Sequence, residues 1–445
     1  MNKRETTFKI IQAALRAVDP QTAVKAHLRR DGNLLQCGPK TYDLHAFHRV
    51  RIIGFGKGSA PMVQAVHELL HDVITDGLVI VKYEHTLPPE IDVSPVRIVE
   101  AGHPVPDENG LTQTKALIQL LQDSTEQDLI LCLVSGGGSA LLTQPASGLT
   151  LSQMQSTTQR LLEAGADITE INTIRKHLSA IKGGWLAKYA MPATILSLIL
   201  SDVQGDQLDM IASGPTEPDS TTYADALALL EKYHLTDRLE PIVLDHIKQG
   251  IAGEIPETPK KGDPAFSRVN NVIISNNQAA VQAAVQAAQS LSFNAASFDT
   301  FIEGEASHVA KRVANLAKIL SGNADLIQKP ALLVFGGETT VTMGADHGLG
   351  GRNQELALAA AIELQGEPAL TIAFVATDGN DGPTDAAGAL IDGDTIARAK
   401  QAGLDPATYL THHDSYHFFQ ALEGLIITGP TNTNVNDLIL LIAWS

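Results

Sequence analysis

Short apolar runs alternate with amphipathic stretches through the first half of the chain. We expect strands at 50–54, 77–82, 96–101, 129–134 and 194–200, and helices near 59–74, 110–123 and 151–190. Continuous apolar strands separated by helices are typical of a parallel sheet covered on both faces. The first 20 residues form an amphipathic pattern without the apolar core of a signal peptide, which predicts a further helix. We assign residues 1–250 to this α/β domain.

A second α/β pattern follows a polar, proline-bearing stretch at 253–266, which we interpret as a linker between domains. The strands expected here are 269–274, 331–335, 370–376 and 424–428, and the helices lie near 277–290, 304–321 and 352–364. This pattern predicts a smaller second α/β domain over residues 267–430, followed by a tail at 431–445.

The composition of the chain indicates which kinds of molecule the protein can bind. The chain has 445 residues, which favours two domains, and a formal net charge of −18 with only 4% aromatic residues. An acidic, aromatic-poor chain is a poor binder of nucleic acid, so we expect small-molecule ligands and no nucleic acid partner. Two cysteines suit a reducing cytoplasm, and the longest apolar runs are too short to cross a bilayer, so we expect a cytoplasmic protein.

Two glycine-rich turns follow buried strands and precede helices. The first, Gly54 to Ser59, carries Gly56 and Lys57, and its spacing is neither a Walker A loop nor a dinucleotide fingerprint. Consecutive glycines are costly unless the backbone must adopt positive φ or admit a ligand closely, which favours phosphate binding. A solvated turn lysine and a ligand-free sharp turn are the alternatives. The second turn contains Ser135, Gly136, Gly137, Gly138 and Ser139.

Other polar groups are candidates for catalysis or binding. Asp202 follows the strand at 194–200 and is suited to a base or a magnesium ligand. Arg175, Lys176 and Lys182 could bind a carboxylate or phosphate, although a solvated helix face explains them equally well. His103, in a proline-rich turn, could contact substrate or support a residue that does.

The run 349–355 is the most informative segment of the second half. Gly350 and Gly351 precede Arg352 at a predicted helix start, where backbone N–H groups, the helix dipole and a guanidinium favour an anion. The flanking strands end near Glu338 and near Asp378 and Asp381, whose carboxylates suit magnesium. Tight turns with solvated charges are the alternative. The fifteen histidines form no zinc motif, and there is no serine nucleophile elbow.

In order along the chain, these segments resemble the glycerate 2-kinase family, also labelled hydroxypyruvate reductases or MOFRL-domain proteins. The resemblance runs from about residue 50 to the end of the chain. Asn432 departs from the family's TGPTGTNVND pattern, which has glycine there, and this puts the local loop geometry in question. The matching stretches are GFGKGSAPM (54–62), GHPVPDENG (102–110), LVSGGGSALL (133–142), NTIRKHLSAIKGG (172–184), SDVQGDQLDMIASGPT (201–216), FGGETTVT (335–342), GLGGRNQELAL (348–358), ATDGNDGPTDAAGA (376–389) and TGPTNTNVNDL (428–438).

The resemblance implies transfer of the ATP γ-phosphoryl group to the 2-hydroxyl of D-glycerate, with Mg²⁺ as cofactor. It implies a Rossmann-like N-terminal domain, a smaller α/β C-terminal (MOFRL) domain, an active site in the cleft between them, and a tail that returns toward the cleft. A homodimer is one assembly left open. Carried onto this sequence, the catalytic residues are Lys57, Arg352 and Asp202, with Asp202 and Asp378 as metal ligands. The phosphate-binding residues are Gly56, the 135–139 turn, Gly350 and Gly351, and the substrate or supporting residues are His103, Arg175, Lys176, Glu338 and Asn434.

Two alternatives remain. A nicotinamide-dependent hydroxypyruvate reductase needs a pyrophosphate fingerprint, and no segment supplies one. A non-catalytic sugar-phosphate-binding regulator would keep the anion loops without the metal-suited carboxylates.

Overall fold

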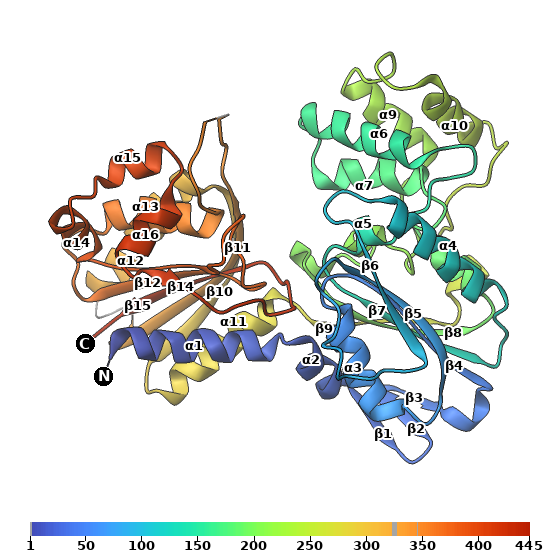
Figure 1. Cartoon of the computed structure of the whole chain (residues 1–445), viewed down its shortest axis with the longest axis horizontal. Coiled ribbons are helices and arrows are strands. Elements are labelled where there is room, and N and C mark those ends of the chain that lie inside the picture. Colours follow the sequence, from blue (N-terminus) through green and yellow to red (C-terminus); the bar gives the residue numbers. More distant parts are fainter. Residues whose placement is uncertain (1, 323–326, 345) are drawn as a thin grey trace. The chain divides into compact units, whose positions relative to one another are not determined.

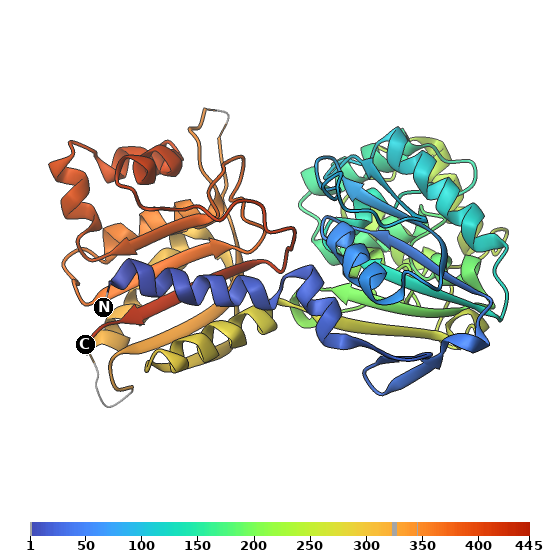
Figure 2. The ribbon, with the colours of Figure 1, turned by 60° about the horizontal axis from the view of Figure 1, so that its bottom comes forward.

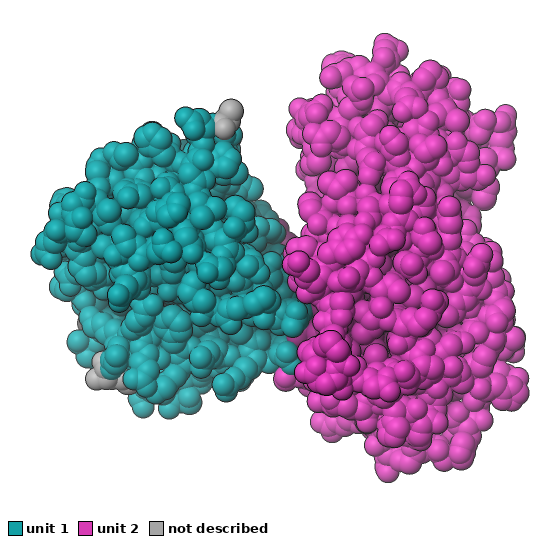
Figure 3. All heavy atoms as spheres, viewed as in Figure 1, with its two compact units in different colours: residues 1–19, 275–445 teal, residues 20–274 magenta. Residues whose placement is uncertain are grey.

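The computed structural model describes residues 2–322, 327–344 and 346–445. The chain divides into two compact units, shown in different colours in Figure 3. Unit 1 comprises Met1–Asp19 and Ser275–Ser445, and unit 2 comprises Pro20–Ile274. The α/β class with two sheets, predicted from the strand and helix pattern, is confirmed.

A six-stranded sheet with the order β6-β5-β4-β7-β8-β9 forms the centre of unit 2 (Figure 1). The pairings β4–β5, β4–β7, β5–β6 and β7–β8 are parallel. The strands are β4 (Arg49–Phe55), β5 (Ile74–Lys82), β6 (Val96–Ala101), β7 (Asp128–Val134), β8 (Thr194–Leu200) and β9 (Val269–Ser275). This sheet is the Rossmann-like parallel sheet expected of the N-terminal half.

Helices cover both faces of this sheet, which explains why its strands are apolar without alternation. In β7, Leu129, Leu131 and Leu133 pack on the side of α3, and the intervening residues pack on the side of α4. Four more helices form a cluster with its own apolar core. The helices of unit 2 are α2 (Pro20–His27), α3 (Ser59–Leu70), α4 (Glu108–Gln122), α5 (Gly138–Leu141), α6 (Leu151–Glu163), α7 (Ile168–His177), α8 (Trp185–Ala190), α9 (Tyr223–Lys232) and α10 (Pro241–Ile251).

A small antiparallel sheet, β1 (Leu28–Asp31), β2 (Leu34–Cys37) and β3 (Lys40–Asp43), precedes β4. We did not predict it from the sequence, because its strands are short and largely polar. The single helical stretch expected over 151–190 is three helices, α6 to α8, separated by turns at Gly165 and Gly183–Gly184, where φ is positive.

Unit 1 is built on a mixed sheet with the order β10-β11-β15-β12-β13-β14. Strands β10 and β11 are parallel, whereas β15 lies between β11 and β12 and is antiparallel to both. Helices α1 and α11 cover one face, and Figure 2 shows α1 along that face. The strands are β10 (Asn294–Glu305), β11 (Ala331–Thr340), β12 (Leu370–Ala376), β13 (Gly388–Asp392), β14 (Leu425–Ile426) and β15 (Asp437–Ala443), and the helices are α1 (Lys3–Ala17), α11 (Asn277–Ser290), α12 (Ala306–Gly322), α13 (Arg352–Glu363), α14 (Thr395–Gln401), α15 (Pro406–Thr411) and α16 (Ser415–Ala421).

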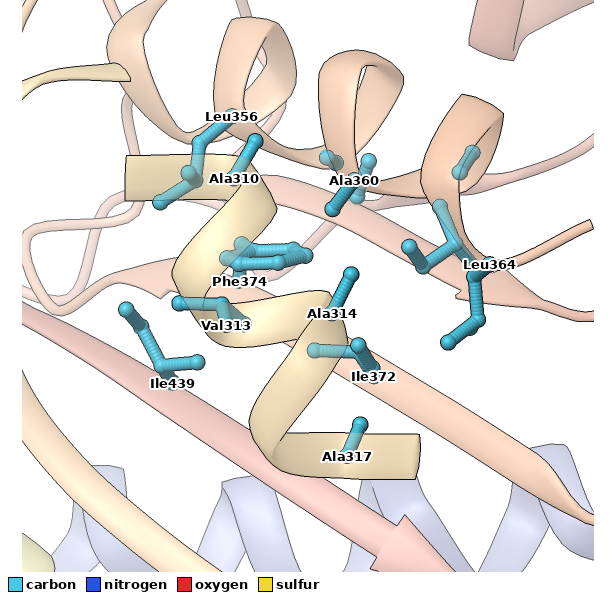
Figure 4. Packing of buried hydrophobic residues seen from close by; sticks show 14 of the residues in the cluster. Ala310, Val313, Ala314, Ala317, Leu356, Ala360, Leu364, Ile372, Phe374 and Ile439 are labelled. Carbon is cyan, nitrogen blue, oxygen red and sulfur yellow. The ribbon is translucent and has the colours of Figure 1, made fainter. Parts of the chain in front are cut away.

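The opposite face of the unit 1 sheet is covered by α12 and α13. Alanines on both helices, among them Ala314 and Ala360, leave little side-chain volume between the helices and allow them to pack closely (Figure 4). Phe374 of β12 and Ile439 of β15 fill the space beneath, and both are at most 1% exposed. The helix predicted at 352–364 therefore also serves as a core element, which rigidly positions its first residue, Arg352.

The division into units differs from the predicted domains in three places. Residues 1–19 belong with the C-terminal half, because Ile10, Ile11 and Ala14 of α1 are buried against α11. Strand β9, expected to open the second domain, instead joins the edge of the unit 2 sheet beside β8. The tail, 431–445, supplies the interior strand β15, since its apolar run is fully buried between two neighbouring strands.

No helix within the described part of the chain is both long enough and apolar enough to span a membrane.

The position of α1 generates a stability prediction. Ile10→Ala removes a side chain that is 0% exposed, so unfolding of unit 1 should become easier by roughly 2–5 kcal/mol. Hydrogen exchange should accelerate in α11 and remain unchanged in β4 and β7. Ile319→Ala, which truncates a 54% exposed isoleucine of α12, is the control and should have little effect. Faster exchange confined to unit 2 would show that α1 stabilises the other half of the chain.

Candidate functional site

The order of strands in unit 2 creates a topological switch point between β4 and β7. From β4 the chain proceeds outward through β5 to β6, then crosses back to β7 and proceeds the other way to β8. The loops that follow β4 and β7 therefore diverge from adjacent strand ends, and open α/β sheets bind ligands at such points. These two loops, residues 56–58 and 135–139, are called the paired loops below.

Hydrogen bonds hold the paired loops against each other. The backbone N–H of Lys57 donates to the Gly136 carbonyl at 2.9 Å, and the N–H of Gly58 donates to Ser135 Oγ at 2.9 Å. Gly56 has φ +138°, and a Cβ there would lie 2.1 Å from Ser135 Oγ. Only glycine permits this approach, so the Gly56 requirement comes from contact between the loops.

The helix that follows the first loop begins without a cap from the side chain of its N-cap residue. Helix α3 begins at Ser59, and its N-cap residue, Gly58, has no side chain that could accept a hydrogen bond from the first turn. The side chain of Lys57, which immediately precedes this helix, is half-buried. Loop N–H groups, a helix start and a lysine together favour an anion at this edge.

His103, from the turn after β6, packs directly on the second loop. A Cβ on Gly137, whose φ is +84°, would lie 2.9 Å from His103 Cδ2 and 3.5 Å from Lys57 Cγ. Burial, together with the positive charges of Lys57, Lys82 and His85, lowers the pKa of His103 to about 4. His103 is therefore a neutral imidazole at pH 7 that adjoins Lys57 without adding charge.

The far end of the second loop is fixed by buried polar contacts. Ser139 Oγ lies 2.8 Å from Ser213 Oγ, and the Ser213 hydroxyl donates to Asn172 Oδ1 of α7 at 3.0 Å. Ser213 has φ +62°, a left-handed conformation that costs a non-glycine residue about 1–3 kcal/mol. Such strain persists where surrounding contacts impose it, as they do here.

Lys182 supports the same loop from beneath. Its ammonium donates to the carbonyls of Ser139 at 2.6 Å and Leu142 at 2.8 Å, and the side chain is 2% exposed. Burial lowers the pKa of Lys182 to about 7, with a smaller contribution from the nearby Arg175 charge. This corrects the expectation that Lys182 contacts a ligand. The sequence could not show its supporting role, because that role depends on carbonyls about 40 positions away.

The two basic residues predicted on α7 differ in environment. Lys176 is 2% exposed and its Nζ lies 3.2 Å from both Asp209 Oδ2 and Asp219 Oδ1. It is thus committed to internal ion pairs, which corrects the expectation that it contacts a ligand. Arg175 is half-buried and makes no such pair with any residue that the structure describes.

Asp202 lies in the loop after β8, the strand next to β7, so it follows the same edge of the sheet as the paired loops. Its side chain is half-buried. In unit 2 the structure therefore groups Lys57, the paired loops, His103, Arg175 and Asp202 around the carboxyl ends of the parallel strands.

Arg352 of unit 1 is clamped by two carboxylates. Its Nε and Nη2 bind Asp437 at 2.6 and 2.9 Å, and Nη1 donates to Glu338 Oε1 at 2.6 Å. Burial raises the pKa of the Asp437 carboxyl, and the bidentate bond from Arg352 opposes that rise. Asp437 pairs with Gly337 in the β11–β15 register, so the antiparallel neighbour brings these groups together.

The glycines before Arg352 serve packing. Asp381, 1% exposed, accepts from the backbone N–H groups of Asn353 and Gln354 at 3.0 and 2.8 Å, and so caps α13. A Cβ on Gly351 would lie 2.3 Å from the Asp381 carboxyl carbon, and one on Gly350 would lie 2.3 Å from Ser415 Oγ. The Asn353 and Gln354 N–H groups at the start of α13 are therefore used internally, and buried Asp381 is committed to them, which corrects the expectation that Asp381 is a metal donor. Phosphate binding by Gly350 and Gly351 stays a prediction.

The loops after β12 and before β15 support each other. The N–H of Thr431 donates to the Asp378 carbonyl at 3.2 Å, and Asn434 Oδ1 accepts from the N–H of Asn436 at 3.2 Å, which closes a turn. Asn432 has φ +57°, and asparagine tolerates this left-handed region better than other non-glycine residues. Asparagine in place of the family's glycine is therefore compatible with the left-handed conformation that this loop adopts.

No group of three or more His, Cys, Asp or Glu side chains suited to a metal ion occurs among the described residues. The two carboxylates predicted as magnesium ligands, Asp202 and Asp378, belong to different units. Asp437 was missed as a partner of Arg352, although it ends the NVND motif directly before an apolar run, which is the signal that could have identified it.

The paired loops at the switch point define an α/β protein whose strand edge carries groups suited to an anion. Comparisons with known proteins agree with this class and narrow it. A family model described as "Domain of unknown function (DUF4147)" matches residues 6–248, and the MOFRL family model matches residues 331–437. The chain is 41% identical to a D-glycerate 2-kinase of Thermotoga maritima, covering 98% of this chain and 97% of that protein. It is 38% identical to a glycerate 2-kinase of Pyrococcus horikoshii, covering 100% and 98%.

The crystal structure of the Thermotoga maritima glycerate kinase matches with a TM-score of 0.86 at 40% identity, over 99% of each chain. A relative from Agrobacterium vitis, 38% identical over 98% of this chain and 94% of its own length, bears the name hydroxypyruvate reductase. The chain belongs to the glycerate kinase family. The family resemblance expected from the sequence is confirmed.

The environment of His103 generates a pH prediction. Because the folded pKa is about 4 and the ordinary value about 6.5, the unfolded chain binds more protons between these values. The contribution of His103 to stability is therefore complete above pH 6.5 and is lost as the pH falls toward 4. Histidine NMR signals should show a midpoint near 4 without ligand, and the midpoint should rise when ATP binds beside Gly137. A titration midpoint that does not change when ATP is added would mean that phosphate binds away from His103.

Proposed function

We propose that this protein is a glycerate 2-kinase, which transfers the γ-phosphoryl group of ATP to the 2-hydroxyl of D-glycerate and releases 2-phosphoglycerate and ADP. The observation that carries the proposal is the 41% identity to a D-glycerate 2-kinase over nearly the full length of both chains. The anion-binding edge of unit 2 supports it independently, because phosphoryl transfer depends mainly on positioning and charge neutralisation.

In the proposed reaction the glycerate 2-hydroxyl oxygen attacks the γ-phosphorus while the bond to the ADP oxygen breaks. Asp202 accepts the proton of that hydroxyl, and Lys57 neutralises charge on the phosphoryl group as it moves. His103, neutral and in contact with Gly137, supports Lys57 by occupying the space beside it without competing for the anion.

Arg352 is proposed as the second cation for the phosphoryl group. Its guanidinium retains two carboxylate partners in the ligand-free structure, of which Glu338 is 43% exposed and Asp437 is 4% exposed. The buried Asp437 orients the guanidinium, while the exposed Glu338 can be displaced by an anion. Because Lys57 and Arg352 belong to different units, their action on one phosphoryl group in a shared cleft stays a prediction.

The carboxylates proposed as magnesium ligands suit an ion that is also bound by substrate phosphates. Mg²⁺ is usually held by one or two carboxylates together with substrate phosphates, so a preformed protein cage is unnecessary. Asp202 and Asp378 are the residues proposed to hold it. The ion would neutralise phosphate charge. A cytoplasmic location and a homodimer stay predictions.

The name carried by the Agrobacterium vitis relative keeps hydroxypyruvate reductase as a second candidate. The β4 loop argues against it, since the position of the third fingerprint glycine is Ser59, whose buried hydroxyl donates to the Leu133 carbonyl. Mixing the protein with NADH and hydroxypyruvate and following absorbance distinguishes the two. Failure to consume ATP with any hydroxy acid, together with failure to consume NADH with hydroxypyruvate, would favour a non-catalytic regulator.

A coupled assay tests the main proposal. ADP release is followed with ATP, magnesium and a panel of hydroxy acids, and ³¹P NMR identifies the phosphorylated position. Phosphate at the 2-position of D-glycerate is the expected product, whereas phosphate at the 3-position would contradict the assignment.

Replacement of Lys57 tests charge neutralisation. Lys57→Ala should lower kcat by a factor on the order of 10² to 10³, similar to the loss of one electrostatic donor. Lys25→Ala, which breaks an exposed ion pair with Glu68 in the same unit, is the control and should retain activity. Near-normal turnover of the Lys57 variant would refute its role.

Replacement of Arg352 tests whether the reaction needs bidentate binding by a guanidinium. Arg352→Lys keeps the charge but cannot bind bidentately, so kcat should fall at least on the order of tenfold. Arg398→Lys, which alters a surface pair with Asp392 in the same unit, should leave kcat unchanged. A lower melting temperature with intact kcat would make Arg352 purely structural.

A further inference from the structure

Arg175 is a permanent cation in unit 2 for which the described part of the chain provides no counter-charge. Its guanidinium is half-buried, and it forms no hydrogen bond or ion pair within residues 2–322, 327–344 and 346–445. Burial lowers the pKa of Arg175, yet an arginine stays protonated in proteins. A desolvated charge without a partner is costly, and a bound anion would remove that cost.

The neighbours of Arg175 increase the local excess of positive charge. Lys182 is close enough for the Arg175 charge to lower the Lys182 pKa, so two basic side chains lie near one another. Lys182 donates hydrogen bonds to the Ser139 and Leu142 carbonyls, which are uncharged and therefore supply no counter-charge. The adjacent Lys176 shows the contrast, because its ammonium is matched by Asp209 and Asp219.

The helix face places Arg175 beside the second paired loop. Asn172 and Arg175 are three residues apart on α7, so they share a face. Asn172 accepts from Ser213, whose hydroxyl lies 2.8 Å from that of Ser139. Arg175 therefore stands at the Ser139 end of a loop whose other end, at Gly136 and Gly137, contacts Lys57 and His103.

We propose that Arg175 binds the carboxylate of the hydroxy acid and thereby determines that the acceptor substrate is an acid. This inference rests on the proposed kinase function. A planar guanidinium matches a carboxylate with two parallel hydrogen bonds, whereas Lys57 is a compact point charge suited to the moving phosphoryl group. The paired loops then present one cation for each charged part of the reaction, phosphate at one end and carboxylate at the other.

Steady-state kinetics of Arg175→Met and Arg175→Lys test the assignment. Both should raise the KM for D-glycerate, the Met variant on the order of 100-fold, and leave the KM for ATP unchanged. The preference of the wild type for D-glycerate over its uncharged amide should largely vanish in Arg175→Met. Added guanidinium ion should partly restore activity to Arg175→Ala, a rescue that a merely structural role would not give. Arg97→Met, which changes an exposed arginine of β6, is the matched control and should match the wild type.

Other outcomes separate the two proposals. A higher KM for ATP with an unchanged KM for D-glycerate would assign Arg175 to nucleotide phosphate and overturn the inference. Unchanged discrimination between acid and amide would overturn it too. If the wild type phosphorylates nothing, calorimetric titration with D-glycerate decides. Binding that Arg175→Met abolishes would retain the carboxylate site and refute only the kinase, and absence of wild-type binding would refute both.

Discussion

The close approach of two loops at one strand edge is the constraint on which the unit 2 site depends. Strands β4 and β7 are parallel neighbours, and their following loops are in contact only because Gly56 has no Cβ to meet Ser135. Backbone hydrogen bonds between the loops then orient Lys57, and Gly137 admits the His103 ring. Larger residues at these positions would separate the loops and disperse the groups that they hold.

Unit 1 positions its cation by a different device. Its interior strand β15 comes from the last residues of the chain and is antiparallel to both neighbours. Asp437, the first residue of β15, therefore lies beside the end of β11. Arg352 is bound there bidentately, and Asp381 neutralises the start of the same helix. Of the two carboxylates that bind Arg352, Glu338 is the exposed one, so its ion pair with Arg352 is the one that an anion could replace.

Local charge, more than net charge, decides what this acidic chain can bind. The formal charge is −18, yet the paired loops adjoin Lys57, Arg175 and Lys182. Of these, Lys182 is committed to loop carbonyls, and burial keeps His103 neutral, so the cations differ in availability. Which cations at this edge are committed to internal contacts is a property of the local structure that composition does not record.

Much of the fold and part of the site were readable from the sequence, because apolar periodicity and glycine-rich turns are local signals. The pattern predicted the central strands of unit 2, the helix that begins at Arg352, and the loops around Lys57 and Ser135. It could not predict that α1 packs with the C-terminal half or that the tail is an interior strand, since partner choice depends on contacts hundreds of residues apart. The roles of similar residues were likewise undecided. Lys176 and Arg175 are adjacent and both basic, and only the tertiary structure pairs Lys176 with Asp219 and gives Arg175 no ion pair with a described residue. Local sequence determines which groups a turn or helix carries, whereas burial and the partners brought by distant strands decide their charge state and availability.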